Sequence, residues 1–459
     1  MTPEPSGREI RRTIANLVWP ATVESVLQMG VGLVNTGMVG HLSATAIGAV
    51  GLTNRATMVA WALFQAVSTG ATVLVAQSIG SGRRDRAKTV ASQALLFGTS
   101  SVVTLALVFA IFGSKVLSIF KPDPALLSTA TAYLRIVVLG MPAVGIMTAS
   151  GASMRGAGNT RTPMVIAVFV NLINLAGNSV LIYGRLGFPA LGITGSAIST
   201  VTAQWIGALL ALFAVMGKNS PLGLVWRGPW RFSKPELKEM LGIGLPATGE
   251  SLFWQAAAII LTLFITGFGT EALAAHQLGL QAESISYMPT AGFGIAATAL
   301  VGQAIGARNT RLAKRVTREL GMLVSLITAF TAGLLILLPK QILSLLTNDP
   351  EVIALGAIYL RLMGTAQIPQ QLGGVFTGAL RGSGDTRTPM YIAALGLWCV
   401  RLPLAYTLAF PLKMGIAGVW TGMTVDLFVR FTLTALRYRR IPWVSGETLR
   451  TQRVAPGFD

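Results

Sequence analysis

Twelve long apolar runs constrain the fold of this chain more than any other feature of its sequence. A helix needs about 20 apolar residues to cross the roughly 30 Å of hydrocarbon in a bilayer. Such runs occupy about 13–39, 46–78, 88–113, 126–149, 162–185, 192–217, 237–267, 273–305, 313–337, 352–378, 388–411 and 415–437. With 52% hydrophobic and only 12% charged residues, the 459-residue chain is too apolar for a soluble globular protein. We therefore expect an all-α integral membrane protein with twelve transmembrane helices.

An internal repeat divides these helices into two sets of six. MRGAGNTRTPM (154–164) returns as LRGSGDTRTPM (380–390), WPATVESVL (19–27) as LPATGESLF (245–253), and ATVLVAQSIG (71–80) as ATALVGQAIG (297–306), always at the same spacing. We predict an N-terminal lobe over 1–218, a cytoplasmic linker over 219–237, and a C-terminal lobe over 238–459 with a short basic tail. An even number of crossings separates equivalent helices. The lobes should therefore be related by a pseudo-two-fold axis along the membrane normal, with a cavity between them.

The net charge of +19 reflects membrane topology rather than a nucleic-acid site. Twenty-six of the 36 lysines and arginines fall near one set of helix ends, and the alternate loops hold five. Because cytoplasmic loops carry the excess of Lys and Arg, this pattern places both termini in the cytoplasm. We expect a multi-pass protein of the inner or plasma membrane that binds no nucleic acid.

The repeated segment around residue 158 is predicted to form a turn between two helices. Gly158 lets the chain leave the first helix, and Thr160 or Thr162 can cap the second. Arg155 and Arg161 are expected to anchor the cytoplasmic boundary. A phosphate-binding role for the glycines is disfavoured, because no Gly-Lys-Ser/Thr ending is present.

Several motifs at these helix ends resemble those of the multidrug and toxic compound extrusion (MATE) transporters, from about Leu17 to Arg440. Besides the repeated turns they are LVNTGMVGHL (33–42), LVAQSIGSG (74–82), NLINLAGN (171–178), FPALGITGSA (188–197), EALAAHQLGL (271–280) and LVGQAIGA (300–307). The resemblance implies two six-helix lobes in a V and alternating access. It also implies efflux of small or bulky amphipathic compounds, often cationic, driven by an inward proton or sodium gradient. We expect such a transporter to be a monomer without a cofactor.

Polar residues within the apolar runs are the candidates for this chemistry, because a charge in the bilayer is costly and tends to mark function or pairing. On the first helix Glu24, Gln28 and Asn35 share one face at 100° per residue. The candidate ion-coupling and substrate-binding residues are Glu24, Gln28, Asn35, Asn174, Asn178, Glu250, Gln281 and Glu283.

This sequence departs from the family pattern at the positions where many members carry acids. Many members have Asp at the position of Asn35, and some have Asp at the position of Asn178. Trp254 replaces a Glu found in one branch of the family, and Gln370 replaces an Asp. None of these four side chains can release a proton. Sodium binding in the first lobe is therefore disfavoured, because a hard cation prefers oxygen ligands that include a carboxylate.

The acids that remain within the membrane are Glu24, Glu250, Glu283 and Asp426. A buried carboxylic acid can load and release protons near neutral pH, so proton coupling is preferred to sodium. Glu24 and Glu250 are the first choice, because they occupy equivalent positions in the two lobes. The alternative is that each is a neutral hydrogen-bonded acid or a partner for Arg55 or Arg401 that holds helices together.

The charged residues Asp426, Arg401 and Arg430 are predicted to form a structural ion pair, and no metal site is predicted. Asp426 can pair with Arg430 at i, i+4 or with Arg401 across helices. Two His and one Cys in the whole chain predict no metal site.

The sequence thus predicts secondary active efflux of organic cations by proton-coupled antiport. No cluster of nucleophile, acid and metal ligand suggests an enzyme. The rival is a flippase for lipid-linked oligosaccharides or lipids of the same superfamily. Such flippases often have arginine-rich cavities for anionic pyrophosphate, so the direction in which Arg55 and Arg401 point would discriminate the two.

Overall fold

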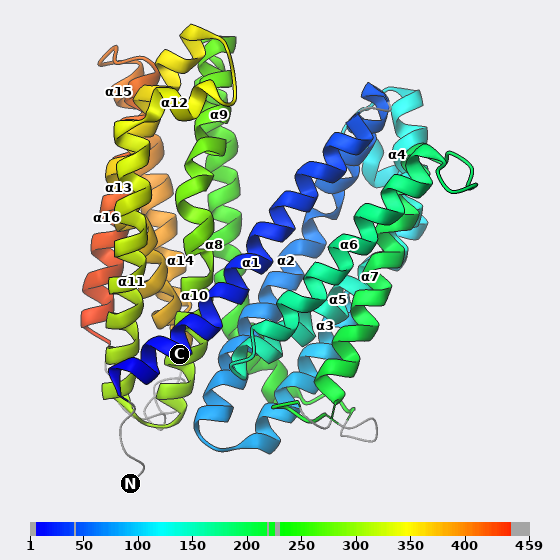
Figure 1. Cartoon of the computed structure of the whole chain (residues 1–459), viewed down its shortest axis with the longest axis vertical. Coiled ribbons are helices and arrows are strands. Elements are labelled where there is room, and N and C mark those ends of the chain that lie inside the picture. The colour runs from blue at the N-terminus through cyan, green and yellow to red at the C-terminus, as the bar shows by residue number, and fades with distance from the viewer. Residues whose placement is uncertain (1–5, 41–42, 218–219, 225–229, 442–459) are drawn as a thin grey trace, which may run out of the picture. The chain divides into compact units, whose positions relative to one another are not determined.

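The computed structural model of the protein describes residues 6–40, 43–217, 220–224 and 230–441. Every regular element in these ranges is helical (Figure 1). The first repeat forms α1 (Gly7–Gly40), α2 (Ala44–Gly80), α3 (Arg84–Ser118), α4 (Pro124–Val137), η1 (Val138–Gly140), α5 (Met141–Gly156), α6 (Arg161–Tyr183) and α7 (Gly192–Met216). The second repeat forms α8 (Lys234–Thr266), α9 (Thr270–Tyr287), η2 (Met288–Thr290), α10 (Ala291–Gly306), α11 (Thr310–Leu337), α12 (Pro339–Ser344), α13 (Pro350–Ser383), α14 (Arg387–Ala394), η3 (Leu395–Arg401), α15 (Leu402–Ala409) and α16 (Ile416–Arg439).

The helices match the twelve predicted crossings. Eleven spans among the described residues are long and apolar enough to cross a membrane, and the 34-residue helix α1 supplies the remaining one. Two spans, α4–α5 and α9–α10, contain a short 3-10 turn followed by continued helix. The span over α14–α15 contains the π-helical segment η3, which the sequence did not predict. Large apolar side chains such as Leu107, Ile111, Leu326 and Phe330 are exposed in the isolated chain. Such exposure fits a protein surrounded by lipid.

The chain packs into two compact units whose boundaries lie inside helices. One unit, here the N-terminal unit, comprises Trp19–Gly244, and the other, the C-terminal unit, comprises Met1–Val18 together with Leu245–Asp459. Both boundaries fall at equivalent positions of the repeat, since Trp19 and Leu245 each open the repeated Pro-Ala-Thr segment. The first turns of α1 thus pack with the second repeat, and the first turns of α8 pack with the first. Relative to the predicted lobes over 1–218 and 238–459, the compact units exchange these turns.

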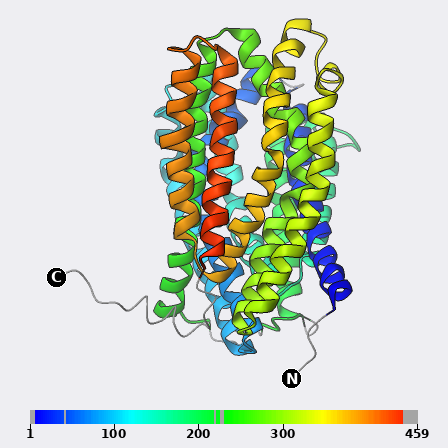
Figure 2. The ribbon, with the colours of Figure 1, turned by 90° about the vertical axis from the view of Figure 1, so that its left-hand side faces the viewer.

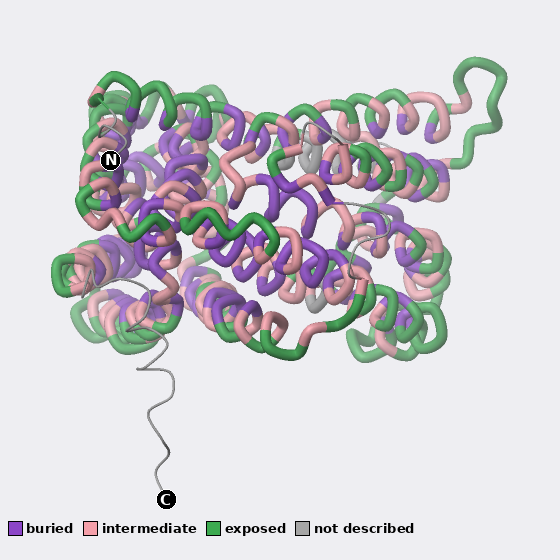
Figure 3. The backbone as a smooth tube through the Cα atoms, turned by 90° about the horizontal axis from the view of Figure 1, so that it is seen from below, coloured by how far each residue is buried: buried purple, intermediate pink, exposed green. Residues whose placement is uncertain are grey.

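Each unit has its own apolar core. In the N-terminal unit, Leu74, Val90 and Ala152 of α2, α3 and α5 form a buried cluster that includes Leu222 and Met240. In the C-terminal unit α16 lies between α15 and α13 (Figure 2), and Tyr359 of α13 packs its ring 5.4 Å from that of Trp420. Figure 3 shows the buried residues within the helix bundles and the exposed ones mainly on outer turns and loops.

The repeated segment forms the predicted turn, but its cap differs from the prediction. Gly158 adopts a left-handed conformation with φ +85°, as Gly384 does with φ +94°. The capping acceptor of α6 is the side chain of Asn159, whose Oδ1 accepts from the backbone N–H of Thr162. Its equivalent Asp385 accepts from the backbone N–H of Thr388. The threonines at 160 and 162 therefore do not supply the predicted cap, because the residue before them already does.

Candidate functional site

A pocket in the N-terminal unit contains the first of two equivalent ion pairs. The cavity of about 420 Å³ is lined by aromatic and amide side chains, including Trp61, Phe64 and Asn171. Arg155 Nη1 donates to Glu24 Oε1 at 3.0 Å, and both side chains line this cavity. Their side chains are only 14% and 12% exposed, so the pair is largely shielded from water.

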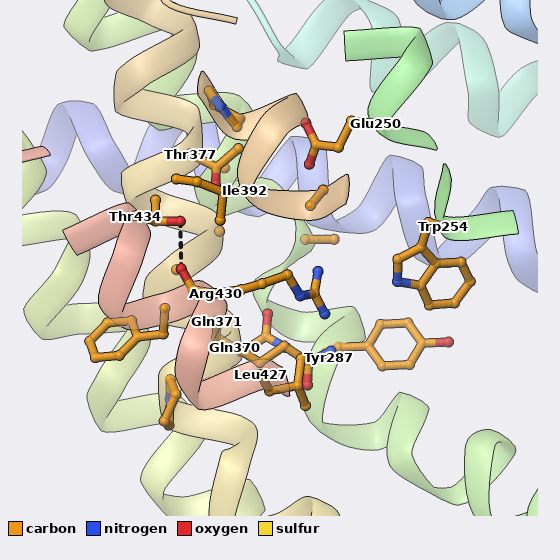
Figure 4. Close-up of a pocket in the computed structure, with 18 of the residues that line it drawn as sticks. Glu250, Trp254, Tyr287, Gln370, Gln371, Thr377, Ile392, Leu427, Arg430 and Thr434 are labelled. Carbon is orange, nitrogen blue, oxygen red and sulfur yellow. Dashed lines mark hydrogen bonds between the residues drawn. The ribbon is translucent and has the colours of Figure 1, made fainter. Parts of the chain in front are cut away.

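A pocket in the C-terminal unit contains the second pair. Arg381 Nη2 donates to Glu250 Oε2 at 2.6 Å, and both residues line a cavity of about 650 Å³. Figure 4 shows this pocket, with Glu250 and Trp254 from α8, Gln370 and Gln371 from α13, and Arg430 from α16 around it. Each glutamate belongs to a repeated Pro-x-x-x-Glu, and each arginine opens a repeated Arg-Gly turn.

These partners differ from those that the sequence suggested. Arg55, proposed as a partner for the membrane acids, is exposed on α2, and Arg401 contacts Asp426 instead. Arg155, predicted to lie at the cytoplasmic boundary, also lines the pocket and pairs there with Glu24. Each of the two acids preferred from the sequence, Glu24 and Glu250, is thus engaged by an arginine of its own unit.

Glu283 of α9 is the one predicted coupling acid whose hydrogen-bond partners are uncharged in the described part of the chain. Tyr359 donates its hydroxyl to Oε2 at 2.5 Å, and Gln367 donates Nε2 to Oε1 at 2.7 Å. Both partners come from α13. Glu283 is 4% exposed and lines the pocket of Figure 4. His276, which precedes Glu283 on α9, packs edge-on against the ring of Tyr359.

Asp426 lies between two arginines in the same unit. Arg401 Nη2 is 2.8 Å and Arg430 Nη2 is 3.0 Å from Asp426 Oδ2, and Asp426 is fully buried. Arg401 ends the π-helical segment η3, which changes the helical register just before it. Gly396 in η3 makes the close approach possible, since a Cβ there would lie 2.4 Å from Asp426 Oδ1. Both predicted partners thus contact Asp426 together.

The asparagines of α6 form a neutral contact in the N-terminal unit. Asn174 donates Nδ2 to Thr200 Oγ1 at 3.0 Å, and Asn178 donates Nδ2 to Asn174 Oδ1 at 3.4 Å. Neither lines the two pockets described above, although Asn171 lines the first. These two hydrogen bonds involve amide and hydroxyl groups, and the Asn174–Thr200 bond joins α6 to α7.

Of the last three predicted residues, one lies away from these pockets, and the side chains of the other two are not among the described ones. Gln281 is exposed on α9 and lines neither pocket. The side chains of Gln28 and Asn35 lie outside the described residues.

Sequence reasoning missed Tyr359, Arg155 and Arg381 as site residues. Arg155 and Arg381 appear in the sequence only as members of the repeated turn, and contacts over 76 and 131 residues leave no local pattern. The described residues contain no cluster of three or more His, Cys, Asp or Glu side chains that could hold a metal ion.

Comparisons with known proteins agree with this architecture. The sequence profile of the MatE family matches residues 20–180 and 246–407. A probable multidrug resistance protein NorM of Thermotoga maritima is 32% identical over 457 residues, which cover 98% of this chain and 97% of the relative. The uncharacterized transporter YisQ of Bacillus subtilis is 29% identical over 436 residues, 94% of this chain and 95% of the relative.

A crystal structure of a MATE protein in the bent conformation has the same fold. Its TM-score is 0.87 over 94% of this chain and 95% of that chain, at 21% identity. The profile match over both repeats and the relative from Thermotoga maritima establish the family on their own. The chain belongs to the MatE family of membrane transporters, the family that its repeated motifs resemble.

Proposed function

We propose that this transporter exports small amphipathic cations by antiport, driven by an inward proton gradient and through alternating access, as a monomer with both termini in the cytoplasm. The relative named a probable multidrug resistance protein supports an efflux role. The observation that carries the coupling proposal is Glu283, a buried acid that lines a pocket and is held by uncharged groups.

The surroundings of Glu283 suit a proton better than a sodium ion. Sodium requires several oxygen ligands, whereas both oxygens of Glu283 accept hydrogen bonds from protein donors. A tyrosine hydroxyl can also accept a hydrogen bond, and a glutamine amide can present its oxygen instead. Gln367 Oε1 is buried and has no hydrogen-bond partner among the described residues. Tyr359 and Gln367 can therefore satisfy Glu283 with or without a proton.

The charges around the pocket give the proton and a cationic substrate opposite effects. Arg381, Arg401 and Arg430 line the pocket together with Glu250 and Glu283, and Asp426 pairs with Arg401 and Arg430. With all six ionised the cluster is neutral. A proton on Glu283 adds one positive charge, which disfavours a bound cation in a low-dielectric site. Competition between proton and cation for one acid is the requirement for antiport.

The rival flippase function requires arginines that are free to bind an anionic pyrophosphate. Arg381 is paired with Glu250, and Arg401 and Arg430 share Asp426. Arg55 is exposed on α2 rather than in either pocket. The arrangement of these arginines therefore favours export of cations over transfer of anionic lipid.

The test is ethidium transport in proteoliposomes that contain the full-length protein. A proton gradient and a sodium gradient are imposed in separate samples. We expect ethidium movement with the proton gradient alone, and its loss when an ionophore dissipates that gradient. Robust transport energised by sodium alone would reverse the choice of ion. Movement of a fluorescent pyrophosphate-linked lipid without ethidium transport would favour the flippase.

A further inference from the structure

We propose that Arg155 and Arg381 are positioning residues that hold α1 and α8 at the points where these two helices pass from one compact unit to the other. Their release from Glu24 and Glu250 accompanies the change of state during transport. This proposal rests on the alternating access of the proposed function.

The first observation is that two uninterrupted helices belong to both units. Helix α1 crosses from the C-terminal to the N-terminal unit after Val18, and α8 crosses in the opposite sense after Gly244. Any relative movement of the units must therefore be absorbed in these helices. Each has a proline just beyond the crossing, Pro20 or Pro246, which removes a backbone hydrogen-bond donor at that point.

The segment before each crossing is firmly held. Ile10 and Ile14 of α1 are buried in a cluster with Leu320 of α11, and Arg11 Nε lies 2.8 Å from Glu319 Oε2. These contacts combine apolar burial with an ion pair, so they resist separation.

The corresponding segment of α8 is held in the same way. Met240 and Ile243 are buried against α2 and α3, and Glu239 Oε2 lies 2.6 Å from Arg86 Nη2. A Cβ on Gly244 would lie 1.9 Å from the carbonyl oxygen of Ala66, so the two helix backbones are in close contact. This segment cannot slide along α2 without losing that fit.

Just beyond each crossing point, the helix is held by an ion pair. Glu24 and Glu250 follow the prolines by one helical turn, and each meets the arginine of its own unit across 131 residues of sequence. A single ion pair can break and re-form without repacking a core. Because both pairs line pockets, a charged ligand that enters a pocket can compete for either partner. Binding of a ligand in either pocket can therefore release the helix that the ion pair holds just beyond the crossing point.

The test combines transport with a distance measurement in full-length protein reconstituted in liposomes. Ser118 and Ser344 are exposed and equivalent in the repeat, one in each unit, and Cys399 is the only cysteine. The variant C399S/S118C/S344C carries two spin labels. Pulsed electron paramagnetic resonance spectroscopy gives the distribution of distances between them with and without ethidium. Arg155→Ala and Arg381→Ala are each expected to change that distribution in the absence of ethidium. We expect each to lower the maximal ethidium transport rate about tenfold.

Two sets of variants control this test. Arg161→Ala and Arg387→Ala remove the second arginine of each repeated turn, where the side chain is exposed, and are expected to leave both readouts unchanged. The exchange variant E24R/R155E restores the pair with reversed charges and should recover the distance distribution and most of the rate. An unchanged distribution in Arg155→Ala and Arg381→Ala would overturn the proposal. So would an exchange variant that folds but behaves like Arg155→Ala. If the unaltered protein moves no ethidium, the proposed function fails. The distances between the two spin labels still test whether Arg155 and Arg381 hold α1 and α8.

Discussion

Arg381 lies 2.6 Å from Glu250, and at the equivalent positions of the first repeat Arg155 lies 3.0 Å from Glu24 in the same relationship. The repeat has therefore preserved a contact between the start of a lobe and the end of its fourth crossing, and not only a pattern of helices. The two acids that the sequence favoured for coupling are engaged by arginines. Glu283, which has uncharged partners, takes their place as the proton carrier in our proposal.

Glu24→Gln is expected to weaken ethidium efflux and to lower stability by about 2 kcal/mol, because it leaves Arg155 largely buried without a charged partner. Thermal unfolding in detergent measures the stability, and the proteoliposome assay measures the efflux. Glu9→Gln on the exposed part of the same helix is the control. Normal efflux and stability in Glu24→Gln would show that the ion pair has no function in this protein.

Glu283→Gln is expected to abolish proton-driven efflux, with a loss of at least about tenfold, while the protein still folds. Glutamine keeps the shape of the side chain and can still accept from Tyr359, but it cannot exchange a proton. Substrate-induced proton release from the purified protein should disappear with the transport. Glu271→Gln, an exposed acid in the first turn of the same helix, should behave as the unaltered protein. Proton release that persists in Glu283→Gln would assign the proton to another acid.

The fold could be predicted from the sequence because its determinants are local. Apolar runs long enough to span a bilayer fix the number of crossings, and the constant spacing between the paired motifs fixes the repeat. The Asp426–Arg430 contact could also be predicted, since i, i+4 residues share a helix face.

The remaining site contacts could not be predicted, because they depend on how helices pack. Tyr359 reaches Glu283 from a different helix, and the turn that carries Arg155 gave no sign that its arginine points inward. The π-helical segment that places Arg401 also shifts the register by which periodicity would have aligned it. The exchange of the first turns of α1 and α8 between units leaves the repeat itself unchanged, so the sequence could not reveal it.

Asp426→Asn is expected to be the most destabilising single change of a charged residue in the C-terminal unit. It leaves two arginines, one of them almost fully buried, without their shared carboxylate, at a cost of about 3–5 kcal/mol. Thermal unfolding in detergent should show the loss, and Asp123→Asn at an exposed helix start should not. Gly396→Ala should be destabilising too, because its Cβ would clash with Asp426 and Arg430. An Asp426→Asn protein as stable as the unaltered one would mean that the three charges do not hold η3 and α16 together.

Gly244→Ala tests whether the start of α8 packs on α2 as closely as the structure indicates. The added Cβ would lie 1.9 Å from the carbonyl oxygen of Ala66, so the two helices must separate. We expect a loss of about 2–3 kcal/mol, or no folded protein. Gly242→Ala is a matched control on the same helix, because a Cβ there meets nothing within 4 Å. Since alanine favours a helix over glycine by about 0.5–1 kcal/mol, that variant should be as stable as the unaltered protein or slightly more so. Thermal unfolding of both variants in detergent gives the comparison. Equal stability of the two would show that the first turns of α8 do not contact the N-terminal unit at Ala66. The packing that holds α8 before its crossing point would then be absent.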